Sequence, residues 1–346
     1  MPGLLLDTLR GNRSAHVPLW LMWQAGRYLP EYRALRERKG GFLAMAYDSE
    51  AACEITLQPI ERFGFDGAIL FSDILIVPHA LGQHLEFLAG EGPKLSPRLV
   101  DASLASLTRD PSRYEPIYQT VRLCRERLPA DVTMLGFAGS PWTVATYMVA
   151  GEGSRDQHEA RALAYRDPGA LQAIIDAIVT ETIAYLSGQI QAGAEAVQLF
   201  DSWAGSLAPD EFERWVIAPN ARIVAALTEL HPDTPVIGFP KGAGDKLPAY
   251  ARETGVHAIG IDETLDPVIV GRALPQGMPV QGNLDPLLLL AGTNALEARI
   301  AAILDAFADR PHVFNLGHGI DRRTPIAHVE RLIAAVRSNT IRSHAG

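Results

Sequence analysis

Short apolar runs alternate with longer amphipathic stretches along the whole chain. Each run ends in glycine or a polar residue, and the stretch after it carries apolar residues at helical spacing. The runs are interpreted as strands at Leu19–Met22, Gly67–Phe71, Val132–Phe137, Ala196–Phe200, Pro235–Phe239, His257–Ile261, Met278–Gln281 and Val313–Leu316. We therefore expect eight strands, most of them followed by a helix.

The stretches between the runs carry helix signals. A helix is predicted over Ser49–Phe63, with Asp48 or Ser49 as its N-cap. Further helices are predicted at Tyr114–Leu128, within 155–191 with a break near Asp167–Gly169, at Asp210–Leu230, at Ala295–Phe307 and from Thr324-Pro325 onward. In the last of these, the threonine would cap the helix and the proline would occupy its first position.

Eight strand–helix units are typical of a single (β/α)8 TIM barrel, in which the reactive groups follow the C-terminal ends of the strands. The alternative is an open, doubly wound sheet. No run is followed by the G-x-G-x-x-G pattern of the dinucleotide-binding form, and Gly242–Asp245 is only a partial match. We expect one domain over 1–346, with a short N-terminal arm at about 1–15 and a loose C-terminal tail at about 340–346.

Composition narrows the classes of protein further. The 346 residues include 31 Lys and Arg against 40 Asp and Glu, a formal charge of −9. This balance argues against a general nucleic-acid-binding protein, which needs a basic face. No apolar run reaches about 18 residues and no secretion signal opens the chain, so we expect no membrane span and a cytoplasmic location. The two cysteines, Cys53 and Cys124, exclude a disulfide scaffold and any four-cysteine metal site.

The predicted strand ends carry polar groups that could act together. Asp73 follows an apolar strand, where a rigid carboxylate would stabilise developing positive charge or would merely cap the next helix. Arg27 lies in a glycine-containing loop, where its planar fork would bind a carboxylate or would pair with Glu31. His318 lies between two glycines, which would let a ligand come close.

Further strand-end groups are Tyr147, Ser202 and Lys241, each of which is also compatible with an ordinary polar or solvated residue. Neither cysteine has a cysteine or histidine at ligand spacing, so no zinc site is expected. One acid, several cations, a histidine and hydroxyl groups suit an anionic substrate that is handled by charge placement. Nothing in this set demands a cofactor.

Seven separated motifs match one known family. They are Pro18–Arg33, Thr56–Ile60, Phe71–Leu75, Gly136–Thr143, Tyr147–Val149, Gln281–Pro286 and Asn315–Gly319. Over about residues 5–340, the chain resembles the uroporphyrinogen decarboxylases.

The resemblance implies a single barrel with a deep cleft, usually a homodimer, that works without a metal or an organic cofactor. Such an enzyme converts the four acetate side chains of uroporphyrinogen III to methyl groups, giving coproporphyrinogen III in tetrapyrrole (haem and chlorophyll) biosynthesis. The catalytic aspartate, which accepts hydrogen bonds from pyrrole N–H groups, is implied to be Asp73. The implied substrate-binding residues are Trp23, Gln24, Ala25, Gly26, Arg27, Asp73, Tyr147, Ser202 and His318.

This chain departs from the family pattern at Trp23, where relatives carry an arginine that meets substrate carboxylates. An indole offers bulk and one N–H but no charge, and a lost charge-assisted contact costs about 1.5–3 kcal/mol. A lesser departure is Glu263, where relatives often carry an aromatic residue. Two alternatives stay open: a weakened or inactive tetrapyrrole-binding relative, and a corrinoid or thiol methyltransferase, whose zinc ligands include cysteines.

Overall fold

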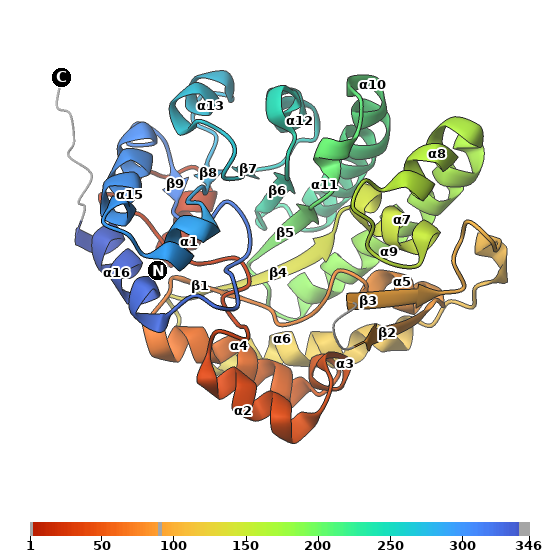
Figure 1. Ribbon diagram of the computed structural model, residues 1–346, viewed down its shortest axis with the longest axis horizontal. Helices are drawn as coiled ribbons and strands as arrows, with labels where there is room; N and C mark the ends of the chain where they lie inside the picture. Colours follow the sequence, from red (N-terminus) through yellow and green to blue (C-terminus); the bar gives the residue numbers. More distant parts are fainter. Residues whose placement is uncertain (1–2, 89–91, 339–346) are drawn as a thin grey trace.

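Seven parallel strands form one curled sheet, and helices cover its outer face (Figure 1). The computed structural model describes residues 3–88 and 92–338. In order of pairing, the strands are β1 (Gly67–Ile69), β4 (Thr133–Gly139), β5 (Ala196–Asp201), β6 (Val236–Pro240), β7 (Ala258–Gly260), β8 (Val280–Gln281) and β9 (His312–Val313). Neighbours in the sheet are consecutive along the chain apart from a hairpin, which excludes the reversed strand order of a doubly wound sheet.

The segment around Leu19 takes the eighth position of the barrel. Leu19 forms a parallel bridge with Phe314, which directly follows β9. On its other side, the Leu19 carbonyl accepts the N–H of Asp66 at 2.9 Å, directly before β1. The barrel therefore closes, and the predicted (β/α)8 fold is confirmed. The predicted strand Leu19–Met22 shrinks to this bridge because residues 22–23 form a turn.

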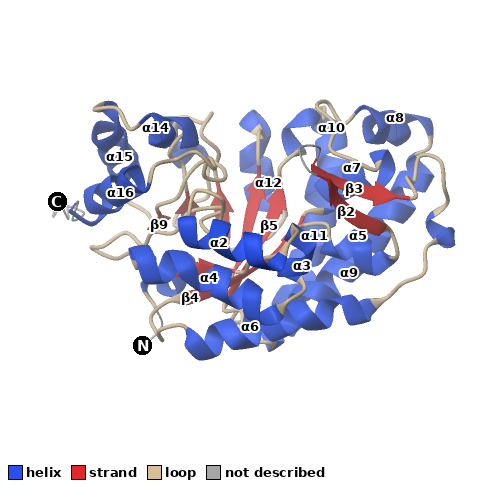
Figure 2. Cartoon of the chain, turned by 60° about the horizontal axis from the view of Figure 1, so that its bottom comes forward, coloured by secondary structure: helices blue, strands red, loops and turns tan. Residues whose placement is uncertain are grey.

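The helices lie on the outside of the barrel strands (Figure 2). They are α1 (Leu4–Leu9), α2 (Pro30–Lys39), α3 (Phe42–Ala46), α4 (Ser49–Phe63), α5 (Ile76–Leu81), α6 (Glu115–Arg127), α7 (Pro141–Ala150), α8 (His158–Arg166), α9 (Pro168–Gln191), α10 (Pro209–Phe212), α11 (Ala218–Leu230), α12 (Leu247–Glu253), α13 (Pro267–Ala273), α14 (Pro286–Ala291), α15 (Ala295–Ala306) and α16 (Ile326–Ser338).

The helix limits follow from local capping chemistry. The α4 helix matches its prediction, because the Asp48 carboxylate accepts the N–H of Ala51 at 3.1 Å and Gly64 ends the helix at φ 63°. The predicted break is confirmed, since Asp167 ends α8 and its side chain caps α9. The predicted threonine cap of the last helix is wrong: α16 begins at Ile326, and the buried Thr324 hydroxyl has no hydrogen-bond partner in the described chain.

Three features lie outside the expected pattern. An antiparallel hairpin of β2 (His84–Leu88) and β3 (Gly92–Ser96) follows α5 and stands apart from the barrel strands (Figure 2). A π-helical turn at Glu213–Ile217 separates α10 from α11, within a region predicted as one helix. The predicted N-terminal arm contains α1, whose buried Leu5 lies against the start of β1. The predicted tail at 340–346 lies outside the described residues.

The α9 helix meets the length and composition of a membrane span, alone among the helices in residues 3–88 and 92–338. Half of its most apolar window is buried, and it contacts α7, α11 and β4. Such burial is typical of a core helix that covers a barrel.

Inside the barrel, buried amides connect the closing segment to the sheet. The Trp20 indole N–H donates to Gln281 Oε1 at 2.9 Å, and Gln281 Nε2 donates to Gln198 Oε1 at 2.9 Å. All three side chains are fully buried. Because buried polar groups need partners, this ladder fixes Trp20 against β8 and β5.

We expect Gln281→Leu to lower the free energy of unfolding by about 2–4 kcal/mol, because it leaves the Trp20 N–H and the Gln198 carbonyl oxygen buried without partners. Urea unfolding followed by circular dichroism measures the change. Gln119→Leu on the exposed face of α6 is the control and should stay within about 0.5 kcal/mol of the unmodified protein. Equal losses in the two variants would contradict the ladder's role.

Candidate active site

Asp73 is partly exposed and follows β1 at the mouth of the barrel, the end at which the parallel strands terminate. Its Oδ1 accepts the N–H of Leu75 at 2.8 Å, which orients the carboxyl before α5 begins. Burial raises the pKa of Asp73 to about 6, and the Leu75 N–H opposes that rise. No cationic side chain pairs with it within the described residues. Asp73 is thus a poorly solvated anion above about pH 6 without a permanent counter-charge.

Tyrosines, rather than cations, surround Asp73. Burial raises the pKa of Tyr147, and the charge of Asp73 raises it further. Burial also raises the pKa of Tyr47 to about 12 and raises that of Tyr185, with smaller contributions from Asp73 in both cases. The Tyr47 hydroxyl and His79 Nδ1 lie 2.8 Å apart. The charges of Arg113 and Asp110 also act on Tyr47, whereas no charged side chain acts on Asp73 itself.

A second group of side chains follows β6, β7 and β9, at the same mouth. The His318 ring meets Trp23 edge-on at 4.8 Å between centroids and stacks near Phe239 at 6.1 Å. Burial lowers the pKa of His318 to about 4, with the nearby Lys241 charge lowering it further and Asp262 opposing. His318 is consequently neutral at physiological pH and presents a single N–H donor.

The glycines beside His318 make room for protein rather than for a ligand. A Cβ on Gly317 would lie 2.2 Å from the backbone nitrogen of Glu263. A Cβ on Gly319 would lie 2.0 Å from the Trp23 ring. We expected these glycines to let a ligand approach, but they instead allow close packing. Their contacts with Glu263 and Trp23 hold His318 between two loops.

The loop after the closing segment buries Gln24 and exposes Trp23. Gln24 is fully buried, because its amide accepts the Leu21 N–H and donates to the Gly67 carbonyl. These two hydrogen bonds fix the shape of the loop, and Ala25 and Gly26 follow at the bend of the same loop. Trp23 has a left-handed backbone, φ 59°, and its side chain is 58% exposed over the mouth. The turn therefore places the indole outward, above His318.

Arg27 is exposed, and its guanidinium makes no hydrogen bond or ion pair in the part of the chain that the structure describes. The rival pairing with Glu31 does not form, since Glu31 is held by Arg62 at 2.7 Å. Arg33 instead donates to the Arg27 carbonyl at 2.9 Å and fixes the loop. Arg27 is therefore free to meet an anion.

The two predicted hydroxyl residues lie on neighbouring elements. Tyr147 is on α7, directly after β4, and Ser202 directly follows β5; both are partly buried. A hydrogen bond with the Trp203 side chain lowers the pKa of Tyr147 slightly against the effect of burial. The Asp73 charge acts on Tyr147, and Ser202 follows the C-terminal end of β5, so both hydroxyl groups belong to the β4–β5 side of the mouth.

Asp201 is a strand-end residue that was not among the predicted site residues. It ends β5, is fully buried and accepts a hydrogen bond from the Thr143 hydroxyl at 2.5 Å. Burial raises its pKa to about 7. The same Thr143 oxygen accepts the Trp203 N–H at 3.0 Å, so Asp201 anchors the segment that carries Ser202. Its position at the end of a predicted strand, directly before Ser202, is the sequence signal that could have identified it.

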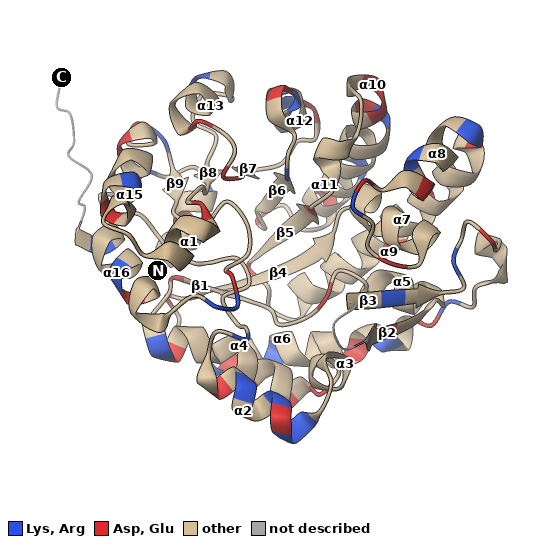
Figure 3. Ribbon diagram, viewed as in Figure 1, with Lys and Arg blue, Asp and Glu red and all other residues tan. Residues whose placement is uncertain are grey.

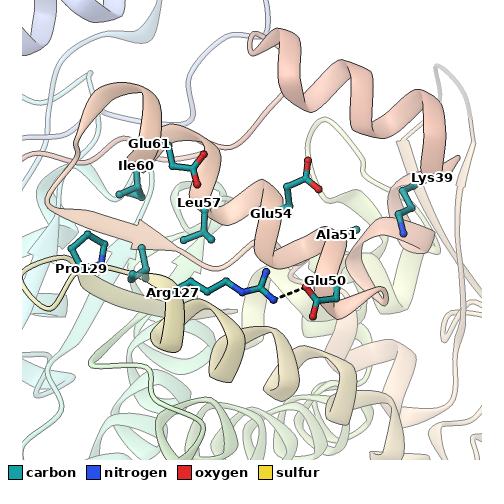
Figure 4. A pocket seen from close by; sticks show the side chains of 10 residues that line it. Lys39, Glu50, Ala51, Glu54, Leu57, Ile60, Glu61, Arg127 and Pro129 are labelled. Atoms are coloured by element: carbon teal, nitrogen blue, oxygen red, sulfur yellow. Dashed lines mark hydrogen bonds and ion pairs between the residues drawn. The ribbon is translucent and has the colours of Figure 1, made fainter.

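Charged residues concentrate on the outer helices, and the strands carry few of them (Figure 3). A separate cleft of about 560 Å³ lies between α4 and α6 and is crossed by the Glu50–Arg127 ion pair (Figure 4). None of the predicted site residues lines it. Within residues 3–88 and 92–338, no group of three or more His, Cys, Asp and Glu side chains is arranged to hold a metal ion.

Comparison with known proteins matches almost the whole chain to one family. The family model of uroporphyrinogen decarboxylase (URO-D) matches residues 3–339. The chain is 72% identical to the uroporphyrinogen decarboxylase of Erythrobacter litoralis over 338 residues, covering 98% of this chain and 99% of that protein. It is 69% identical to that of Novosphingobium aromaticivorans over 337 residues, covering 97% and 99%.

Among solved structures, a methyltransferase from Methanosarcina mazei superposes with a TM-score of 0.81 at 18% identity, covering 96% of this chain and 97% of that one. This likeness shows the shared barrel fold alone. The fold is that of a barrel enzyme, and Asp73 lies at the strand ends among tyrosine hydroxyl groups. The chain belongs to the uroporphyrinogen decarboxylase family. The predicted family and its decarboxylase class are confirmed, and the methyltransferase alternative is not favoured.

Asp73→Asn is expected to stabilise the fold in a pH-dependent way. Because burial raises the folded pKa to about 6, the ionised carboxyl disfavours folding; the penalty is absent below about pH 4 and complete above about pH 6. The amide still accepts the Leu75 N–H. We expect a gain on the order of 2 kcal/mol at about pH 8 and little at about pH 4.

Urea unfolding of both proteins at the two pH values measures this gain. A gain of the same size at both pH values would show that the Asp73 carboxyl is not desolvated in the folded state.

Proposed function

We propose that the protein removes carbon dioxide from the acetate side chains of uroporphyrinogen and that Asp73 is its catalytic residue. The observation that carries the assignment of Asp73 is its buried carboxyl, which has no cationic partner in the described chain and opens to the mouth of the barrel. An anion in such a place lacks both water and a counter-ion. A macrocycle that presents N–H groups and becomes positively charged supplies what this carboxylate lacks.

The reaction needs an electron sink beside the acetate. A proton added to a pyrrole carbon makes the ring cationic. The bond to the carboxylate then breaks, carbon dioxide leaves, and the bonding electron pair neutralises the ring and leaves an exocyclic methylene. A proton added to the methylene gives the methyl group, and loss of the ring proton restores the pyrrole. Each acetate thus consumes one proton and releases one carbon dioxide.

Asp73 favours the transition state over the bound substrate in this scheme. Its charge interacts weakly with a neutral pyrrole and strongly with a cationic one, because the surroundings hold little water. The tyrosines around it carry no charge that would cancel this effect. Hydrogen bonds from the pyrrole N–H groups to the carboxylate centre the macrocycle.

The other predicted residues bind and orient the substrate. The unpaired guanidinium of Arg27 anchors a carboxylate. Tyr147 and Ser202 donate hydrogen bonds from the β4–β5 side. Neutral His318 donates one from the second group of side chains, which follows β6, β7 and β9. Trp23 covers His318 and contributes bulk and an N–H, and Gln24, Ala25 and Gly26 shape the loop beneath it. Proton transfer is the chemistry required, and we propose no cofactor.

We further propose a cytoplasmic homodimer, as the resemblance implies. Large exposed apolar side chains support an association surface: Ile269 on α13 is 68% exposed and Leu287 on α14 is 60% exposed. Sedimentation velocity would distinguish a dimer from a monomer.

Asp73→Asn is expected to lower kcat by about a hundredfold or more, since it removes the charge that meets the cationic ring. The matched control is Asp66→Asn. Asp66 precedes the same strand, is also partly buried, and accepts the Leu19 N–H at 2.8 Å at the far end of the barrel. The control should keep near-normal turnover.

Anaerobic incubation with uroporphyrinogen, followed by chromatography of the oxidised products, provides the measurement. Near-normal product formation by Asp73→Asn would refute its catalytic role. Absence of turnover in the unmodified chain would support the alternative that Trp23 has abolished activity.

A further inference from the structure

Lys241 and Glu263 form a loose ion pair at the barrel mouth. Lys241 follows β6 and Glu263 follows β7, so both lie at C-terminal strand ends. Their Nζ and Oε1 atoms are 3.9 Å apart, and the two side chains are 30% and 24% exposed. That separation is too long for a hydrogen bond. The pair is therefore held by charge alone.

The side chains of both partners lack hydrogen bonds within the described residues. Lys241 Nζ donates none, and the other carboxylate oxygen of Glu263, Oε2, is buried without a partner. A half-buried ammonium and a buried carboxylate oxygen normally find partners. A partly exposed pair of this kind contributes little to stability. The arrangement is therefore poor as a structural salt bridge and easy to open.

Close packing and hydrogen bonds hold the backbone around the pair in place. Gly317 lies against the backbone of Glu263, where a Cβ would come within 2.2 Å. The Asp262 carboxylate accepts the N–H of Gly242 at 2.8 Å and that of Thr264 at 2.9 Å, which ties the loops after β6 and β7 together. The side chains can separate while their backbones stay in place.

Lys241 is also the cation that acts on His318. Its charge lowers the pKa of His318, and Trp23 and Phe239 contact the same ring. Since His318 is neutral and Trp23 has no charge, neither can neutralise an anionic side chain. A carboxylate that enters beside His318 thus meets one N–H donor and one ammonium.

We propose that Lys241 binds a carboxylate of the tetrapyrrole substrate beside His318, and that Glu263 is the internal carboxylate that it releases in exchange. The proposal rests on the proposed function for its ligand, and it adds a binding residue and a competing residue to that site. The bound carboxylate belongs either to an acetate, which is lost in the reaction, or to a propionate, which remains in the product.

The test compares Lys241→Met, Lys241→Arg and Glu263→Gln. Lys241→Met should raise KM for uroporphyrinogen about tenfold or more with kcat changed little, because a ground-state contact is lost. Lys241→Arg should restore most of the affinity. Glu263→Gln should lower KM, since the competitor for the ammonium is gone. In the double variant Lys241→Met/Glu263→Gln, that gain should vanish.

Lys246→Met is the matched control, because Lys246 lies in the same loop with its ammonium 5.3 Å from the Phe212 ring centroid. It should behave like the unmodified protein. Unchanged KM in Lys241→Met, or a raised KM in Glu263→Gln, would overturn the proposal.

Direct binding separates this proposal from the decarboxylase assignment. Anaerobic quenching of tryptophan fluorescence by coproporphyrinogen, the unreactive product, gives a Kd without turnover. Loss of affinity for both macrocycles in Lys241→Met identifies a propionate, and loss for uroporphyrinogen alone identifies an acetate. If the unmodified chain binds these macrocycles through Lys241 but releases no carbon dioxide, the proposed function fails and the binding proposal stands.

Discussion

The site depends on one constraint: a carboxylate, Asp73, is held where water is scarce and no counter-ion from the described chain meets it. Burial alone would protonate it at neutral pH if the pKa rose much beyond about 6. One backbone N–H, from Leu75, limits the rise. In the proposed mechanism, the ligand supplies the hydrogen bonds and the positive charge that this anion lacks. The fold thus keeps a destabilising group, and that group is useful because it is unsatisfied until a positive charge develops beside it.

The segment that closes the barrel also forms part of the site. The segment that completes the barrel through Leu19 continues into the turn that presents Trp23. The Met22 N–H donates to the Asn315 side chain at 2.9 Å, and the Met22 carbonyl accepts the Ile320 N–H at 3.0 Å. The first and last strand positions therefore fix each other, and His318 lies between them. A change in either loop would alter how the opposite side of the mouth receives the macrocycle.

Sequence reasoning recovered what local patterns encode. Apolar runs located most barrel strands, and an N-cap signal together with helical spacing located α4, because these depend on neighbouring residues. The pattern could not show that Leu19 would pair only as a bridge, that Gly319 makes room for an indole, or that Tyr47 and Tyr185 come near Asp73. Those facts arise from contacts between distant segments. Asp201 was visible at a strand end, but its burial was not. The roles of Arg27, Tyr147, Ser202 and His318 were implied by family resemblance and remain predictions.

In this mechanism Asp73 is an isolated, ionised carboxylate in the free protein, and the cationic macrocycle becomes its partner. Nuclear magnetic resonance of 13C-carboxyl-labelled aspartate, with Asp73→Asn used for assignment, measures its ionisation directly. We expect the Asp73 signal to titrate near pH 6 in the free protein. We expect a lower pKa once the macrocycle donates its N–H groups to the anion. A carboxyl that titrates near pH 4 in the free protein, or that becomes protonated when the macrocycle binds, would contradict this role of Asp73.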